Sequence, residues 1–174
     1  MPLLKHQVSH IINGLEQNRS VFEALLRPIL EDQKTWKPEP NKWSLLEVIC
    51  HLYDEEREDF KTRVNCLLQS PVVSPPLFDP TVWVTERRYI DQNYEIKLND
   101  LLEERIASVV WLKSLNDANW LNEYEHPKMG IRTPLFYLSN WLAHDYLHIR
   151  QIMKLKLDYL QHISGTDLKY AGIW

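Results

Sequence analysis

Apolar residues recur along the chain at steps of three and four, the spacing that places side chains on one face of an α-helix. The first such stretch covers residues 3 to 32, with apolar positions at Val8, Ile11, Ile12, Leu15, Phe22, Leu26 and Ile29. Pro28 falls in its last turn, where a proline ends or kinks a helix because it has no N–H to donate. We therefore expect an amphipathic first helix whose last turn is ended or kinked at Pro28.

The second predicted helix has the clearest start signal in the chain. Ser44 and Glu47 form an S-x-x-E capping box, in which each side chain accepts a hydrogen bond from a backbone N–H that the helix leaves free. Trp43 and Val48 occupy the flanking hydrophobic-staple positions. The helical pattern then runs to about residue 69 through Ile49, Leu52, Tyr53, Phe60, Val64 and Leu67.

Two more helices follow. The third runs from Tyr94 through Leu115, and the fourth opens at Thr133, with Pro134 in the favoured first turn, and continues to about Leu160. The stretch SPVVSPPLFDP at residues 70 to 80 lies in the connection between helices two and three. We take this connection as about 12 to 16 residues, which at roughly 3.3 Å each is long enough to cross over a helix. The pattern predicts an all-α four-helix bundle, in which either a crossover or a plain up-and-down order is possible.

Composition narrows the class of protein. With 174 residues and 44% hydrophobic content, the chain can build one core, so we expect a single domain over residues 1–174. No apolar run approaches the roughly 20 residues of a membrane span, and the N-terminus has no signal-peptide pattern, so we expect a cytoplasmic protein with no membrane partner. Cys50 and Cys66 lack the spacing of a zinc ribbon or redox motif, which fits free thiols.

The charge and glycine content argue against two classes of ligand. The net charge of −4 offers no basic surface to a nucleic acid. The four glycines form no phosphate-binding cluster, so no nucleotide cofactor is expected.

The chain has seven histidines, which are the candidate metal ligands. Two pairs have the four-residue spacing that places side chains on one helix face: His6/His10 and His144/His148. The first pair lies opposite the apolar stripe of its helix, so it should face water. The second pair lies on a helix that is apolar over much of its circumference and should be sheltered. Two imidazoles presented from one helix form half a metal site, although two hydrogen-bonded core histidines would give the same pattern.

A third ligand would have to come from another helix, and His51 is the remaining histidine in a helix interior. His51 lies on a polar strip of its helix with Glu47, Asp54 and Glu58. This strip is either a solvated helix face or the wall of a water-filled pocket, in which its carboxylates orient the imidazole. From spacing alone its role stays open. His126, in a turn before Pro127, should be at the surface, and we place His162 in a C-terminal tail.

Three other polar residues fall on helices that carry apolar stripes. Arg105 on helix three and Asp145 on helix four need partners if they are buried, either as an ion pair between the two helices or with Arg105 as an anion-binding group. Gln151, one turn after His148, is placed to bond a ligand histidine or a substrate, or else is a surface amide.

Two segments, WSLLEVICHLYDEE at 43 to 56 and WLAHDYLHIRQI at 141 to 152, resemble the DinB/YfiT-like superfamily of metalloenzymes. The shared pattern is W-S-x-x-E-x-x-x-H-L, a long third helix, a G-x-x-T-P turn and H-D-x-x-H-x-x-Q. The resemblance implies an up-down-down-up bundle in which His51, His144 and His148 hold one divalent transition metal ion. We expect this ion to be nickel or zinc, with iron and manganese as alternatives, because imidazole binds several transition metal ions.

The resemblance also implies a function. Three neutral histidines leave a coordination position open, which is typical of a catalytic ion. We expect either a metal-dependent hydrolase or an S-transferase that uses a low-molecular-weight thiol, such as bacillithiol or mycothiol, acting on a small molecule. Glu47, Asp54 and Glu55 are candidate general bases, each also readable as a solvated helix charge.

Two alternatives to an enzyme remain: a non-catalytic protein that binds a metal or a small ligand, and a helical interaction module without a metal. Seven tryptophans and eight tyrosines, together with the resemblance to dimeric relatives, predict a homodimer.

Overall fold

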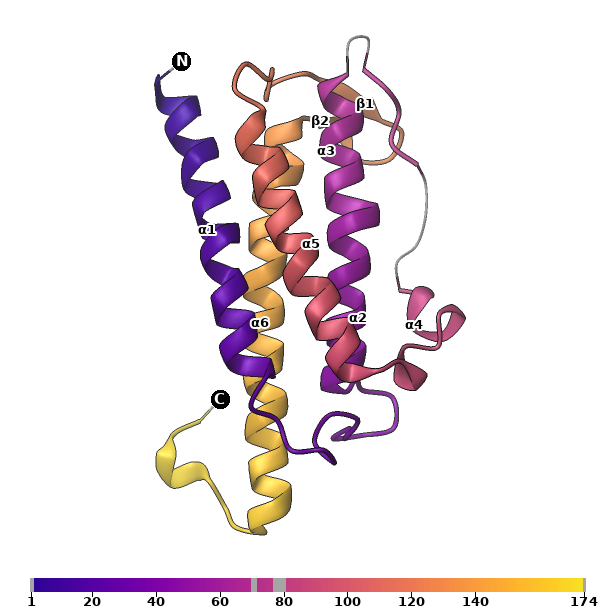
Figure 1. Cartoon of the computed structure of the whole chain (residues 1–174), viewed down its shortest axis with the longest axis vertical. Helices are drawn as coiled ribbons and strands as arrows, with labels where there is room; N and C mark the ends of the chain where they lie inside the picture. Colours follow the sequence, from indigo (N-terminus) through magenta and orange to yellow (C-terminus); the bar gives the residue numbers. More distant parts are fainter. Residues whose placement is uncertain (1, 70–71, 77–80, 174) are drawn as a thin grey trace.

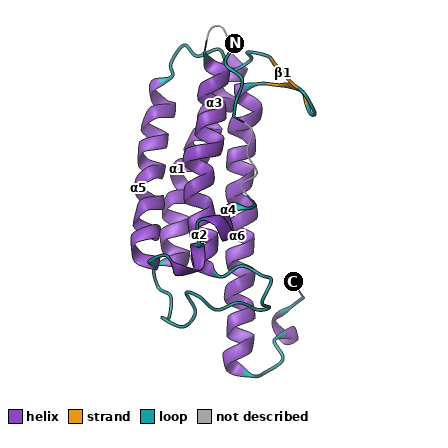
Figure 2. Cartoon of the chain, turned by 90° about the vertical axis from the view of Figure 1, so that its right-hand side faces the viewer, coloured by secondary structure: helices purple, strands orange, loops and turns teal. Residues whose placement is uncertain are grey.

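The computed structural model describes residues 2–69, 72–76 and 81–173. Within them, four long helical segments pack side by side, as the two views in Figure 1 and Figure 2 show. They are α1 (Pro2–Leu26), the continuous run of α2 (Leu45–Asp54), π-helical η1 (Glu55–Phe60) and α3 (Lys61–Leu68), α5 (Tyr94–Ser114), and α6 (Pro134–Ser164). The shorter elements are α4 (Trp83–Glu86), the 3₁₀ turns η2 (Tyr89–Asp91) and η3 (Lys169–Ala171), and an antiparallel hairpin of β1 (Tyr124–His126) and β2 (Gly130–Arg132). The predicted all-α four-helix bundle is confirmed.

The helices follow an up-down-down-up order. In Figure 1, α1 and α6 run downward, whereas the α2–α3 run and α5 both run upward. The chain therefore returns along the outside of the bundle between α3 and α5, through α4 and η2, as the predicted crossover requires. This connection covers residues 69–93, so it is longer than the 12 to 16 residues expected from the sequence, and α4 and η2 lie within it. Of the stretch at 70 to 80, residues 70–71 and 77–80 lie outside the described residues.

The helix starts follow their sequence signals. The Ser44 hydroxyl accepts from the Glu47 N–H at 3.3 Å, and the Glu47 carboxylate accepts from the Ser44 N–H at 2.8 Å, which completes the capping box. At α6 the Thr133 hydroxyl accepts from the Phe136 N–H at 3.1 Å, and Pro134 is the first residue of the helix.

Two helix ends differ from prediction. The first helix ends at Leu26 rather than residue 32, because Pro28 disfavours helical geometry in the residue before it as well as in its own turn. The last helix continues to Ser164, where Gly165 takes the left-handed conformation (φ 61°) that closes a helix. His162 is therefore an exposed residue of α6 and not part of a tail.

The polar strip of α2 is covered rather than solvated. Asp54 accepts a hydrogen bond from the Tyr89 hydroxyl at 2.7 Å and pairs with Arg87 at 2.8 Å, and both partners come from the crossover. Glu47 pairs with Lys37, from the segment before α2, at 2.7 Å. As a result α2 is buried on nearly all sides.

The interior consists of two apolar clusters with a polar layer between them. The first cluster contains Phe22, Leu52, Leu102 and Ile152, and the second contains Leu15, Phe60, Val109 and Leu142. Each long helical segment carries a buried polar residue between its members of the two clusters. These residues are Asn18, Glu56, Arg105 and Asp145.

Arg105 joins these residues into one network. Its guanidinium donates to Asp145 at 2.6 and 2.8 Å, to both oxygens of Glu56 at 2.9 Å, and to the carbonyl of Leu15 at 2.9 Å. Asn18 also donates to Asp145, at 3.0 Å. One side chain of α5, only 2% exposed, thus contacts the other three segments. The expected ion pair between Arg105 and Asp145 is confirmed, and Glu56 is a partner that the prediction did not include.

No helix in the described part of the chain is both long enough and apolar enough to cross a membrane.

Replacing Arg105 by Ala should lower the free energy of unfolding by about 3 to 5 kcal/mol, because it leaves the carboxylates of Glu56 and Asp145 buried without a cation to neutralise them. Lys113→Ala is the matched control on the same helix. It breaks an exposed ion pair with Glu16 and should cost less than about 1 kcal/mol. Urea denaturation of both variants measures the difference, and equal losses would contradict this account of the network.

Candidate metal centre

Three histidine rings from two helices converge at one point in the bundle. His51 comes from α2, and His144 and His148 come from successive turns of α6. The Nε2 atom of His144 lies 3.2 Å from Nε2 of His51 and 3.0 Å from Nε2 of His148. One ring nitrogen from each histidine lies within 4.8 Å of the other two. The structure thus brings together the three histidines singled out from the sequence.

These separations match the spacing of ligands around one ion. Ligand nitrogens about 2.05 Å from an ion are about 3.3 Å apart in tetrahedral geometry and about 2.9 Å apart at neighbouring octahedral positions. The two nitrogen separations at His144 fall between these values. Three neutral imidazole nitrogens are a donor set that suits zinc, nickel, copper and iron. The residues present therefore fit a divalent transition metal ion.

Gln151 orients one of the three rings. The Nδ1 atom of His148 lies 2.7 Å from the Oε1 atom of Gln151. When Nδ1 carries the proton and donates it to this oxygen, the lone pair of Nε2 faces the other two histidines. Of the roles weighed for Gln151, the structure thus shows the hydrogen bond to a histidine.

His51 is held differently. Its ring lies 4.8 Å from the ring of Trp43, between centroids, and its Nδ1 atom is buried without a hydrogen-bond partner in the described part of the chain. On its Nδ1 side the ring is therefore positioned by packing and not by a hydrogen bond. The residue is only 6% exposed, so the solvated position considered for it is wrong.

The surroundings keep the three rings uncharged. Burial, reinforced by the charge that His148 can carry, lowers the pKa of His51 to about 3. Burial lowers the pKa of His144 to about 2, and His148, His51 and Arg105 act in the same direction. Burial also lowers the pKa of His148, against the opposing effects of Gln151 and Asp145. Neutral imidazoles are the form that coordinates a metal.

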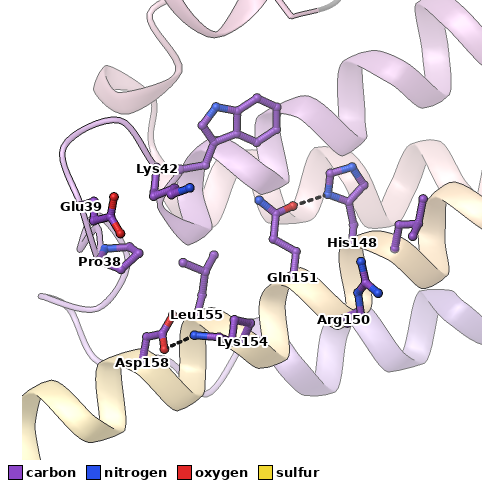
Figure 3. A pocket seen from close by; sticks show the side chains of 11 residues that line it. Pro38, Glu39, Lys42, His148, Arg150, Gln151, Lys154, Leu155 and Asp158 are labelled. Atoms are coloured by element: carbon purple, nitrogen blue, oxygen red, sulfur yellow. Dashed lines mark hydrogen bonds and ion pairs between the residues drawn. The ribbon is translucent and has the colours of Figure 1, made fainter. Parts of the chain in front are cut away.

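A cavity of about 1060 Å³ opens beside this cluster. It lies between α6 and the segment that precedes α2, and His148 forms part of its wall together with Trp43, Gln151 and Leu155 (Figure 3). On the other flank, the ring of Phe60 lies 5.1 Å from that of His144 and stacks on Trp141 at 5.9 Å. The histidine cluster therefore has an apolar flank beside His144 and a cavity beside His148.

The three candidate general bases are all buried, so none is a solvated charge. Glu47 is held by the capping box and Lys37, and Asp54 by Tyr89 and Arg87. Glu55 instead lies beside another carboxyl group, that of Asp59. Burial, with Asp59 close by, raises its pKa to about 8.

The remaining histidines and the cysteines lie outside the cluster. His6 and His10 are exposed on α1, as predicted, and His126 is partly exposed in β1. Cys50 and Cys66 are both free thiols, in agreement with the sequence interpretation.

Trp43 and the pocket lining were missed as site residues. The sequence marks Trp43 as a helix-staple position and as the first residue of the family motif, but no local signal shows that the loop before α2 folds back onto α6.

In metal-free protein, His51 should make stability depend on pH. The pKa of His51 is lower in the folded than in the unfolded chain. Below the unfolded value of about 6.5, the unfolded state therefore binds more protons than the folded state, and the free energy of unfolding decreases as the pH is lowered. Between about pH 6 and pH 4 this should cost about 1.4 kcal/mol per pH unit, and the His51→Gln variant should lack that part of the slope.

Chemical denaturation in the presence of a chelator, at several pH values, measures both slopes. Glu55, whose raised pKa acts in the opposite direction, is common to both proteins and cancels in the difference. His6→Gln, at an exposed position, should run parallel to the wild type. A His51→Gln slope equal to that of the wild type would contradict the buried, neutral ring.

Comparison with known proteins identifies the family. The model of the DinB superfamily matches residues 14–152. The fold is similar to that of YfiT from Bacillus subtilis, which is described as a probable metal-dependent hydrolase with an unusual four-helix bundle topology. The TM-score is 0.76, and the sequences are 20% identical over 94% of this chain and 90% of that chain. It is also similar to TT2238, a four-helix bundle protein, with a TM-score of 0.58 and 19% identity over 84% of this chain and 98% of that one. No curated protein matches the sequence. The chain belongs to the DinB superfamily.

Proposed function

We propose that His51, His144 and His148 together bind one divalent transition metal ion, nickel or zinc in the first place, and that the protein uses it to hydrolyse a small molecule held in the adjacent pocket. The observation that carries this proposal is the convergence of three Nε2 atoms from two helices beside a cavity of which His148 forms a wall. A bound ion of this kind acts as a Lewis acid and lowers the pKa of water toward about 7.

The residues of the chain have separate tasks in this proposal. Gln151 holds the proton of His148 on Nδ1, so that Nε2 keeps a free lone pair. Trp43 and Phe60 pack against His51 and His144 and keep bulk water from these sides of the cluster. The low pKa of His51 and of His144 means that neither ring must lose a proton before it can act as a ligand near neutral pH.

Hydrolysis is preferred because the structurally similar YfiT is described as a probable metal-dependent hydrolase. The second candidate is the thiol-dependent S-transferase, favoured by the same cavity beside His148, where a thiol can be held as thiolate. A protein that binds metal or ligand without catalysis is the alternative to both.

Metal titration tests the ligand set. His51→Ala should weaken binding of Zn²⁺ or Ni²⁺ by at least about a hundredfold, since two imidazoles on one helix seldom hold an ion alone. The His6→Ala/His10→Ala double variant is the matched control, because it removes a pair with the same spacing from an exposed helix face. Competition with a chromophoric chelator gives both affinities. Unchanged affinity in the first variant, or lost affinity in the second, would show that other residues bind the metal.

Activity should require the ion. Purified protein, loaded with Zn²⁺ or Ni²⁺, would be assayed with a panel of p-nitrophenyl esters, and separately with 1-chloro-2,4-dinitrobenzene and a low-molecular-weight thiol. We expect ester hydrolysis that disappears after chelation and in His51→Ala. Thiol conjugation alone would favour the S-transferase. Activity that survives complete metal removal would rule out a metal-centred mechanism.

A further inference from the structure

The pocket beside His148 carries an excess of positive charge on a chain with net charge −4. Five charged residues line it: Lys42, Arg150, Lys154, Glu39 and Asp158. Lys154 and Asp158 form an ion pair with each other. Lys42 and Arg150 form no ion pair and no side-chain hydrogen bond within the described residues, and Glu39 is the one carboxylate left to offset them.

The charged groups are separated along the pocket. Figure 3 shows Glu39 and Asp158 at one end, and Arg150 beside His148 at the other. Lys42 reaches in from the segment before α2, on the side opposite α6. The end of the pocket nearest the histidines therefore has a cation that no carboxylate of the lining neutralises.

Gln151 adds a hydrogen-bond donor to this wall. Because its Oε1 atom accepts from the Nδ1–H of His148, its amide nitrogen must point away from that ring. In Figure 3 this nitrogen is turned toward the pocket, on the side of Lys42. The choice of tautomer that frees Nε2 of His148 thus also fixes an N–H donor in the pocket wall.

The remaining lining is apolar. Trp43, Leu147 and Leu155 face the pocket, and Trp43 packs on the ring of His51. The cavity volume of about 1060 Å³ is at the upper end of the range that holds small organic ligands. A ligand that fits this lining has an apolar group for Trp43 and Leu155 and a negatively charged group for the donors.

We propose that this pocket binds small molecules that carry an oxyanion, a carboxylate or a phosphate, attached to an apolar group, with Lys42, Arg150 and Gln151 as the recognition residues. The planar guanidinium of Arg150 and the ammonium group of Lys42 can both form charge-assisted hydrogen bonds with a carboxylate or a phosphate. The inference deepens the proposed function, on which its relevance to catalysis rests, by naming the class of substrate. The binding itself does not need the metal.

Three matched probes test the proposal: phenylacetate, benzylphosphonate and the neutral phenylacetamide. Each is titrated into the full chain in the presence of a chelator, so that no probe can bind an ion, and the side-chain amide resonances of Gln151 are followed by NMR. At least one anion should bind about tenfold more tightly than phenylacetamide and shift the Gln151 resonances. The comparison of the two anions shows whether the carboxylate or the phosphonate is preferred.

The Lys42→Gln/Arg150→Gln double variant should lose about tenfold in affinity for the preferred anion and leave phenylacetamide binding unchanged. Lys5→Gln/Lys128→Gln, at exposed positions that do not line this pocket, makes the same change in net charge and should bind like the wild type. Thermal unfolding of all variants checks that they fold. Equal affinity for anions and phenylacetamide, or equal loss in both double variants, would overturn the proposal.

The His51→Ala variant separates this proposal from the proposed function. Anion binding that persists in a variant unable to hold the metal supports the pocket independently of the metal. If instead the metal binds as proposed but no anion is preferred, the substrate class is wrong and the metal centre stands.

Discussion

The guanidinium of Arg105 is the contact on which the arrangement of the four helices depends. It joins α5 to Glu56 in η1, to Asp145 in α6 and to the carbonyl of Leu15 in α1, and all of these residues are buried. A buried ion pair adds little stability compared with well-packed apolar residues, but it tolerates few alternative registers because each displaced partner is left unpaired. Since Asp145 directly follows His144, the register that satisfies Arg105 also sets the height of His144 in the bundle.

The crossover explains why a polar helix face lies in the interior. A plain up-and-down bundle would leave one face of α2 in water. Here the connection between α3 and α5 returns past that face, where Arg87 and Tyr89 bind Asp54, and the loop before α2 places Trp43 against His51. His51 is thereby buried without becoming part of an apolar stripe, and its ring faces α6.

The sequence predicts local features well and contacts between distant segments poorly. The capping box at Ser44, the proline start of α6 and the shared face of His144 and His148 depend on neighbours within four residues, so all could be predicted. The burial of His51 depends on Trp43 and on the crossover, and spacing left its role open until the family resemblance was considered. The π-helix at Glu55–Phe60 also escaped prediction, because one wider turn barely disturbs an apolar period that continues on both sides.

The tautomer of His148 links the proposed metal centre with the proposed anion pocket. The amide oxygen of Gln151 accepts a hydrogen bond from the Nδ1–H group of His148, and the amide N–H group of the same side chain faces the pocket. Three neutral imidazoles leave the double charge of a bound ion uncompensated, and Lys42 and Arg150 add positive charge along the pocket wall. An oxyanion held by the wall would not have to bind the ion that the three histidines would hold. The cationic wall and the histidine cluster lie at different places in the pocket. In this proposal an anionic substrate is therefore held through its oxyanion at the wall and reacts through another group near the histidines.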